Sequence, residues 1–286
     1  MARYGKIKAA FEVLATPGVA PLIRRFSRNR GIIFTLHRVL PEAPAAFSPN
    51  AILQVTPEFL ESVIVGARKA GFDIVDLDEA TARLRAEQPD KPFVVLTFDD
   101  AYRDNLEHAL PILRRYSAPF TLYVPTALVD GTGEVWWQAL EDIIASNPVV
   151  VVETDGVPVY LDAETVEQKW QAFATVYRMH RTMPESDRLS ALRTLAERYG
   201  LDLAAHCRSL IMDWQELRTF AEDPLCTIGA HTVHHYELAK LPENQALAEM
   251  TESVRIIEAQ FGKRPRHFSY PIGQPESAAD REFSLA

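Results

Sequence analysis

The sequence FVVLTFDD, residues Phe93–Asp100, decides the fold of this chain. Phe93–Phe98 is a short and nearly continuous apolar run, which is typical of a strand buried on both faces of a parallel sheet. Two adjacent carboxylates, Asp99 and Asp100, follow it directly. Burying such groups is costly unless a cation or a chemical task holds them there. Adjacent residues at a strand end can point to different sides, so the pair predicts one metal ligand and one free base.

The same pair also fits a second interpretation. Asp is a favoured N-cap residue, and a helical pattern follows from Ala101. Asp99 and Asp100 could therefore form a solvent-exposed helix cap, and this segment alone leaves both interpretations open.

Five more apolar runs repeat the pattern of Phe93–Phe98 along the chain. We expect buried strands at Gly31–Leu36, Phe72–Leu77, Phe120–Val124, Cys226–Ala230 and His267–Pro271. Helical patterns lie between them. Alternation of this kind requires parallel pairing with crossover helices, and six such units favour a parallel (β/α) barrel over a small open sheet.

Two of the helices have clear ends. In Glu243–Phe261 the apolar residues are spaced three and four apart, and Gly262 follows as a stop residue. The helix at Glu58–Ala70 opens with Thr56 as its cap and Pro57 as its first residue.

Residues 131–212 interrupt this alternation as an insertion. About a hundred residues separate the strands on either side, although one crossover needs only a few tens. Val149–Glu153 and Val157–Leu161 flank the turn sequence TDG and predict a β-hairpin. Two helices follow, the second at Glu185–Tyr199. An insertion after a barrel strand lies over the carboxyl face, so we expect a lid or a wall for the substrate.

Three of the eight histidines stand within five residues, directly after Cys226–Ala230. His231 and His235 are four residues apart, which brings both imidazoles to one side of a helical turn and suits a metal that accepts nitrogen ligands. His234 faces elsewhere at this spacing, and we expect it to take no part. A chance cluster of surface histidines is the alternative.

Three motifs, taken in order, resemble those of the polysaccharide deacetylase family, also called the NodB-homology family or carbohydrate esterase family 4. They are TFDD at residues 97–100, HTVHH at 231–235 and FSYPIG at 268–273. The similarity covers residues 31–286 apart from the insertion. It implies an α/β fold, a parallel barrel of the NodB type, over that range.

The resemblance also implies roles for residues of these motifs. Asp100, His231 and His235 would hold one divalent metal ion, with zinc as the first expectation and cobalt, manganese or nickel as alternatives. Asp99 would be the general base that takes a proton from the water that attacks the acetamide carbonyl. The backbone N–H of Ile272 would donate to the resulting oxyanion.

Three further residues are candidates for substrate binding. Tyr270 belongs to the third motif, Trp136 of the pair Trp136-Trp137 could stack on a sugar ring, and His37 follows the first predicted strand. For Trp136 and His37 a place in the protein core is the alternative.

The sequence departs from the family pattern at two places. Ser269 stands where family members often carry an arginine that pairs with the catalytic Asp, and Arg264 or Arg266 could replace it. The family's general acid is a histidine beyond the third motif, and no residue up to Ala286 matches it. We therefore expect a C-terminally incomplete barrel that stops inside a helix at Glu276–Ala286.

The resemblance predicts a hydrolase of carbon–nitrogen bonds, a deacetylase of a chitooligosaccharide or of another polysaccharide that contains N-acetylglucosamine. One alternative is a deformylase or deacetylase of a lipid-linked amino sugar. Another is a non-catalytic sugar-binding relative that lacks the general acid.

Composition limits the partners and the compartment. A net charge of −9, with no long basic run beyond the first thirty residues, argues against nucleic-acid binding. No stretch approaches the ~20 apolar residues of a membrane span, and the N-terminus lacks the features of a signal peptide. Cys207 and Cys226 can form no disulfide framework, and we expect both to be buried apolar residues. These features predict a cytoplasmic protein.

Residues 1–30 differ from the rest of the chain in charge. They hold seven Lys and Arg residues against one acid, Glu12. Apolar residues at helical spacing predict two short basic amphipathic helices. These helices would either cover the barrel or lie on the anionic surface of the inner membrane as a peripheral contact.

Overall fold

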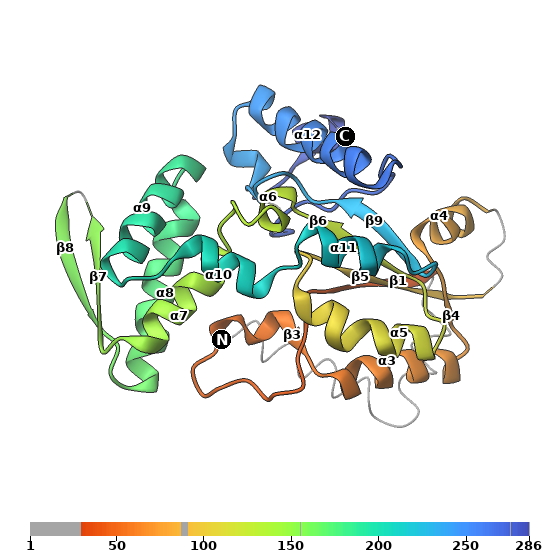
Figure 1. Ribbon diagram of the computed structural model, residues 1–286, viewed down its shortest axis with the longest axis horizontal. Helices are drawn as coiled ribbons and strands as arrows, with labels where there is room; N and C mark the ends of the chain where they lie inside the picture. Colours follow the sequence, from red (N-terminus) through yellow and green to blue (C-terminus); the bar gives the residue numbers. More distant parts are fainter. Residues whose placement is uncertain (1–29, 87–90, 155, 275, 286) are drawn as a thin grey trace.

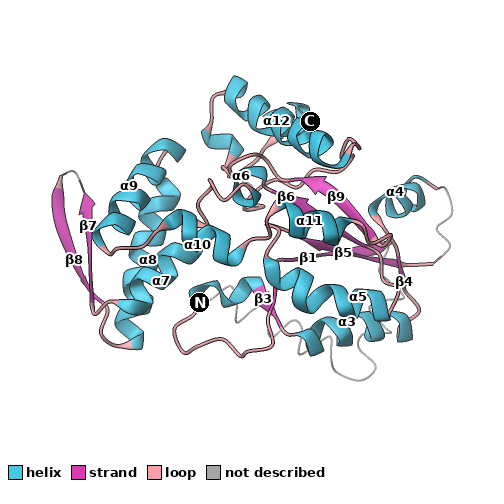
Figure 2. Ribbon diagram, in the orientation of Figure 1, coloured by secondary structure: helices cyan, strands magenta, loops and turns pink. Residues whose placement is uncertain are grey.

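A parallel sheet forms the centre of the molecule (Figures 1 and 2). The computed structural model describes residues 30–86, 91–154, 156–274 and 276–285. The strands of this sheet are β1 (Gly31–Leu36), β4 (Asp73–Ile74), β5 (Phe93–Phe98), β6 (Phe120–Val124) and β9 (Cys226–Ala230). They are ordered β1-β5-β6-β9, with β4 paired to the start of β5, and every pairing is parallel.

Strand β5 is the centre of the sheet. All six of its residues are buried, as expected of a strand covered on both faces. It pairs with β1 along its whole length and with β6 through its second half. Phe98 packs edge to face on Phe120 of β6, with ring centroids 6.1 Å apart. The apolar run that predicted this strand therefore builds the core directly beneath the two carboxylates.

Helices α3 (Pro57–Lys69), α5 (Leu110–Arg115), α11 (Trp214–Ala221) and α12 (Glu243–Phe261) surround the sheet in Figure 1. Each contributes buried residues to the core that β5 and β6 share. The Thr56 hydroxyl accepts the N–H of Phe59 and caps α3. Helix α12 ends at Gly262, whose φ of 67° closes it in the left-handed conformation. The predicted bounds of α12 are confirmed.

Two predicted strands are wrong in extent. Within Phe72–Leu77 only β4 pairs, because the Asp76 side chain caps a helix, α4 (Leu77–Arg85), that starts at the next residue. The strand predicted at His267–Pro271 reduces to a single parallel bridge between Phe268 and the end of β9.

The predicted α/β class with a parallel sheet is confirmed. Among the described residues the strands form an open sheet and do not close into a barrel. Strand β1 is one edge, and its Ile32 and Ile33 are 44% and 53% exposed. The final helix, predicted at Glu276–Ala286, is shorter in the structure and begins at Asp280.

Shorter elements complete the part of the chain that contains the sheet. Strands β2 (Arg38–Val39) and β3 (Gln54–Val55) pair in parallel. The others are the 3₁₀-helix η1 (Pro49–Leu53), the π-helical segment η2 (Asn105–Ala109), α6 (Thr126–Val129), the 3₁₀-helix η3 (Leu238–Lys240) and α13 (Asp280–Leu285).

The insertion lies between α6 and α11 and has an apolar core of its own. Its elements are α7 (Trp136–Ser146), β7 (Val149–Thr154), β8 (Val157–Asp162), α8 (Val166–Thr182), α9 (Glu185–Arg198) and α10 (Leu203–Leu210). The predicted hairpin is present as the antiparallel pair β7–β8. Figure 1 places this hairpin at the end of the insertion far from the central sheet, with α7 to α10 between them. Helices of the insertion, and not its hairpin, are therefore positioned to reach the sheet edge.

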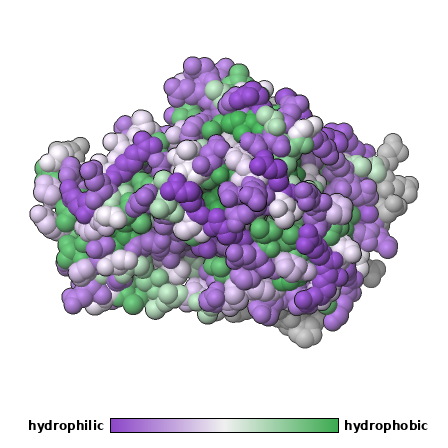
Figure 3. Space-filling view, viewed as in Figure 1, coloured by the Kyte–Doolittle hydropathy of each residue, from purple (hydrophilic) through white to green (hydrophobic). Residues whose placement is uncertain are grey.

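Other predictions from the sequence have mixed outcomes. Cys207 is buried and Cys226 is partly buried, both are free thiols, and burial raises the pKa of each. No helix in the described ranges is long and apolar enough to cross a membrane, and the face in Figure 3 is mostly hydrophilic with apolar patches between. The N-terminal amphipathic helices were predicted for residues 1–30, of which 1–29 lie outside the described residues.

Close packing at Gly229 gives a first prediction. A Cβ there would lie 2.5 Å from Cδ1 of Tyr123 and 3.0 Å from the carbonyl oxygen of His267. We predict that Gly229→Ala destabilises the fold by about 1–3 kcal/mol, because ring and backbone must move apart. Gly66→Ala is the matched control: its Cβ would meet nothing within 4 Å, and loss of glycine from helix α3 should stabilise by about 0.5–1 kcal/mol. Urea unfolding of both variants measures the difference, and equal stabilities would contradict it.

Candidate metal centre and active site

Acidic and imidazole side chains meet at the carboxyl edge of the central sheet. Asp99 and Asp100 follow β5 directly, and His231 follows β9 directly. Because these strands run parallel, their carboxyl ends lie at the same edge, where open α/β sheets bind ligands. His235 follows in the loop after β9.

Asp100, His231 and His235 lie close enough to share one ion. One possible ligand atom from each lies within 4.8 Å of the other two. Asp100 Oδ1 is 3.2 Å from His235 Nε2 and 3.6 Å from His231 Nε2. All three side chains are buried. Such separations suit a single cation with bonds of ~2.0–2.2 Å to nitrogen and oxygen. The structure thus brings together the three residues that were predicted as metal ligands.

A backbone carbonyl fixes the orientation of His231. Its Nδ1 lies 2.7 Å from the carbonyl oxygen of Ser269, and since a carbonyl only accepts, Nδ1 carries the proton. The other ring nitrogen, Nε2, is then left unprotonated and faces Asp100. Burial and the neighbouring His235 lower the pKa of His231 to about 3. A neutral imidazole with one fixed N–H is the form in which histidine binds metals.

The Asp100 carboxylate has the surroundings of a cation ligand. Burial by itself raises its pKa, but the imidazoles of His235, His37 and His231 together hold that pKa well below the ordinary range. Its Oδ1 is buried and has no hydrogen-bond donor among the described residues. An ionised oxygen without a donor, facing two imidazole nitrogens, fits a divalent cation. The alternative of a solvent-exposed helix cap is wrong, because Asp99 and Asp100 are 5% and 1% exposed.

Asp99 lies beside this group without belonging to it. Its Oδ2 is 3.9 Å from His231 Nε2 and accepts a hydrogen bond of 3.4 Å from the Ser269 hydroxyl. Burial, followed by the charge of Asp100, raises the pKa of Asp99 well above its ordinary value. The two neighbouring carboxyls therefore have pKa values shifted in opposite directions.

Neither Arg264 nor Arg266 takes the place beside Asp99 for which they were considered. Arg266 pairs with Asp78 at 2.9 Å and Arg264 lies 3.5 Å from Glu258, and both are largely exposed. Among the described residues, the Ser269 hydroxyl is the only side chain that donates a hydrogen bond to the Asp99 carboxyl.

The backbone is strained at the same three motifs. Asp100, Ala101, Thr232, His235 and Ile272 all have φ between 57° and 72°. Residues with a side chain seldom adopt this conformation, and for a β-branched residue such as Ile272 it is a clear outlier. Strain of this kind persists where the surrounding structure over-determines it and is concentrated at functional sites.

A cavity of about 470 Å³ opens onto these side chains. Its walls come from four parts of the chain: the strand ends, the segment that contains η1, helices α7 and α8, and the third motif. The lining residues are Thr35, His37, Pro49, Asn50, Ile52, Leu53, Asp99, Asp100, Trp136, Trp137, Phe173, Tyr177, His231, His235, Ser269, Tyr270, Ile272, Gly273 and Gln274. A volume of this size is typical of small-molecule sites.

The predicted substrate residues His37, Tyr270 and Trp136 all line this cavity. They differ in how far other residues already contact their side chains. His37 is partly buried, and burial lowers its pKa. Tyr270 turns its hydroxyl toward the carbonyl oxygen of Glu282, to which it donates at 3.3 Å. Trp136 is 2% exposed, stacks on Tyr177 and has the Arg188 guanidinium over its ring. Trp136 is thus a wall of the cavity with most of its surface already in contact.

Sequence reasoning missed much of the aromatic wall. Phe173 and Tyr177, four residues apart on α8, stack on each other and face the cavity, and Trp137 lies beside His235. Their spacing along a helix was visible, but nothing in the sequence shows that the insertion packs against the motifs. His234 was predicted to face away from the metal ligands, and its Nδ1 lies 2.6 Å from Glu249 Oε1, outside this cavity.

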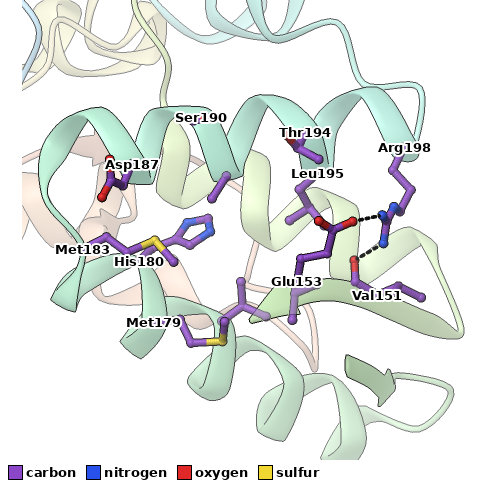
Figure 4. Close-up of a pocket in the computed structure, with 13 residues that line it drawn as sticks. Val151, Glu153, Met179, His180, Met183, Asp187, Ser190, Thr194, Leu195 and Arg198 are labelled. Atoms are coloured by element: carbon purple, nitrogen blue, oxygen red, sulfur yellow. Dashed lines mark hydrogen bonds and ion pairs between the residues drawn. The ribbon is translucent and has the colours of Figure 1, made fainter. Parts of the chain in front are cut away.

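A second cavity, of about 320 Å³, lies within the insertion between β7, α8 and α9. Figure 4 shows Arg198 at one end, bonded to Glu153 and to the carbonyl oxygen of Val151. His180 also lines it, and burial followed by the charge of Arg188 lowers its pKa to about 4. None of the three motifs contributes to this cavity, so the first cavity is the candidate active site.

Comparisons with known proteins identify a family for most of the chain. Residues 86–284 match the family described as polysaccharide deacetylase. The comparison with curated proteins found no match.

Solved structures of low sequence identity share the fold. The deacetylase PplD of Streptococcus pyogenes, solved with acetate, is 17% identical, with 88% of this chain and 77% of PplD covered and a TM-score of 0.54. IcaB from Ammonifex degensii is 17% identical, with coverages of 90% and 79% and a TM-score of 0.52. A de-N-acetylase from Aggregatibacter actinomycetemcomitans is 15% identical, with coverages of 90% and 84% and a TM-score of 0.53.

The opposite pKa shifts of the two carboxyls predict opposite effects on stability. When folding raises the pKa of a carboxyl, that group destabilises the folded state at pH values above its ordinary pKa of ~3.9. When folding lowers the pKa, the group stabilises the folded state at those pH values. In chelator-treated protein at pH 7 we therefore expect Asp99→Asn to raise Tm, each kcal/mol being worth roughly 2–4 °C. Asp100→Asn, the matched control, should lower it.

Thermal unfolding between pH 5 and pH 7 tests this pair. The gain from Asp99→Asn should shrink toward pH 5, because a raised pKa costs the folded state less stability as the pH approaches the ordinary value of ~3.9. A gain that does not change with pH, or two variants with the same sign, would refute the assignment.

Proposed function

The chain belongs to the polysaccharide deacetylase family, and we propose that it removes the acetyl group from an N-acetylated amino sugar of an oligosaccharide or polysaccharide. The observation that carries this proposal is the buried group of Asp100, His231 and His235 with the free carboxyl of Asp99 beside it. Three ligands with a separate base are what metal-assisted hydrolysis of an amide requires.

We assign Asp100, His231 and His235 as the ligands of one divalent cation, zinc by preference, with cobalt, manganese or nickel as alternatives. When bound, such a cation polarises a carbonyl group and lowers the pKa of water. The fixed N–H of His231 and the ionised state of Asp100 are the properties by which these residues would hold it.

Asp99 then acts as the general base. It takes a proton from the water that attacks the acetamide carbonyl, and its raised pKa makes it a stronger base than an ordinary carboxylate. The amine leaves with one added proton, which Asp99 can return, and acetate is the second product. The backbone N–H of Ile272, at the wall of the cavity, would donate to the oxyanion.

The character of the cavity favours a neutral sugar. Asp99 and Asp100 are the only acidic residues in its described lining, which contains no Lys or Arg. Away from the metal ligands, a phosphate on the sugar would find no Lys or Arg in this described lining. This favours a neutral N-acetylated glycan, with contacts to Tyr270, Trp136 and His37, over a sugar whose phosphate lies next to the acetamide. PplD was solved with acetate, the product that such hydrolysis releases.

Location belongs to the proposal as well. We propose a cytoplasmic enzyme whose residues 1–30, with seven basic residues and one acid, form a peripheral contact with an anionic inner-membrane surface. Such a contact would bring a lipid-linked amino sugar within reach, which is the second substrate class to test.

Variants of the site test the assigned roles. We expect Asp99→Asn to keep the metal but to lower turnover by about 10²–10⁴, the usual worth of a general base. His231→Ala should lose both metal and activity. His234→Ala is the matched control, since this ring bonds to Glu249 and not to the site, and it should keep both.

Acetate release from N-acetylated chitooligosaccharides and bound metal are the two measurements. Loss of metal from Asp99→Asn, with activity that excess metal recovers, would reverse the roles of the two carboxylates. No acetate from any N-acetylated glycan with the metal-loaded parent protein would refute the proposed function.

A further inference from the structure

The two imidazoles of the metal centre are held in different ways. His231 is fixed through Nδ1 by the Ser269 carbonyl, whereas Nδ1 of His235 is buried and has no hydrogen-bond partner in the described structure. Metal-binding histidines almost always use the second nitrogen to fix the ring. The orientation of the His235 ring must therefore depend on its packing.

Trp137 supplies that packing. Its ring centroid lies 4.8 Å from that of His235, with the two planes inclined by 46°. Trp137 is 5% exposed, and its Nε1 donates a hydrogen bond of 2.9 Å to the Tyr102 hydroxyl. Because an indole has one donor and no acceptor, this bond fixes the rotation of the Trp137 side chain.

Tyr102 ties both ends of the insertion to the first motif. It follows Asp100 by two residues and is fully buried. Its hydroxyl holds Trp137 at the start of the insertion, and its backbone forms an antiparallel bridge with Ile211 at the end. The guanidinium of Arg103 donates to three backbone carbonyls at residues 208, 209 and 211. The insertion is therefore anchored within a few residues of the metal ligand Asp100.

We propose that Trp137 is a positioning residue for the metal centre: the insertion places its indole against His235 and so directs Nε2 of that ring toward Asp100. This inference rests on the proposed function only in taking Asp100, His231 and His235 as metal ligands. Without the indole, His231, whose ring centroid lies 4.9 Å away, is the remaining aromatic neighbour of the His235 ring among the described residues, and Nδ1 has no hydrogen bond to fix the ring. Loss of an outer partner of a metal-binding histidine lowers metal affinity by ~10–100-fold, and we expect about tenfold here.

Co²⁺ titration of the metal-free, full-length protein tests the proposal. Its visible absorption reports the ligand geometry, and competition with a chelator gives the affinity. We expect Trp137→Leu to bind Co²⁺ about tenfold more weakly with an altered spectrum. Trp137→Phe keeps a ring against His235 and should recover most of the affinity. Trp136→Leu removes a similarly buried indole whose described ring contacts are with Trp137, Tyr177 and His180 and not with His235, and its affinity should stay within about twofold of the parent value.

Equal losses in Trp137→Leu and Trp136→Leu would mark a general effect on packing and overturn the proposal, as would unchanged binding in Trp137→Leu. Tyr102→Phe serves where Trp137→Leu does not fold: it removes only the acceptor of the indole N–H and should weaken Co²⁺ binding in the same direction, and no change would overturn the proposal. Because the readout is binding, a chain with this pattern that releases no acetate would contradict the proposed function and support this inference.

Discussion

Two neighbouring carboxyl groups at the end of a fully buried strand are the constraint on which the site depends. Asp99 and Asp100 cannot both be ionised cheaply in this position, since both are buried and each repels the other. The structure resolves the conflict by giving Asp100 three imidazole neighbours and Asp99 a single weak hydrogen bond. Environments that push the pKa values of two adjacent groups apart assign them different tasks. Here they separate a metal ligand from a base.

This arrangement also requires a strained backbone at the three motifs. Left-handed conformations at Asp100, Thr232, His235 and Ile272 let three short motifs turn sharply at the sheet edge, so that their side chains converge. Packing holds these turns in place. Gly229 lets the chain pass closely by Tyr123 and His267 just before His231. On the side of the insertion, Trp137 packs on the His235 ring and donates a hydrogen bond to the Tyr102 hydroxyl.

Features governed by local sequence could be predicted. The bounds of Gly31–Leu36, Phe93–Phe98, Phe120–Val124 and Cys226–Ala230 agree with the structure, because continuous apolar runs leave few alternatives to a buried strand. The proximity of Asp100 to His231 follows from parallel strands that end at one edge. The strand predicted at Phe72–Leu77 was too long, because the Asp76 side chain caps helix α4 and the chain turns into that helix at Leu77.

Features that depend on tertiary packing could not be read from the sequence. Trp137 was visible as half of a tryptophan pair, yet its contact with His235 joins the insertion to a loop almost a hundred residues away. The aromatic wall of Phe173 and Tyr177 has the same origin, since helical spacing identifies a buried face but not what it faces. Similarly, Arg266 could be proposed as a partner of Asp99, but its pairing with Asp78 is a property of the folded chain.

Anomalous diffraction from crystals of the chain grown with zinc would test the central claim most directly. The account predicts one strong peak at the carboxyl edge of the sheet, bonded at ~2.0–2.2 Å to Asp100, His231 and His235, with Asp99 outside the bonding distance. A peak bonded to Asp99 in place of Asp100, or no zinc at this edge in a chain that still hydrolyses acetamido sugars, would contradict it.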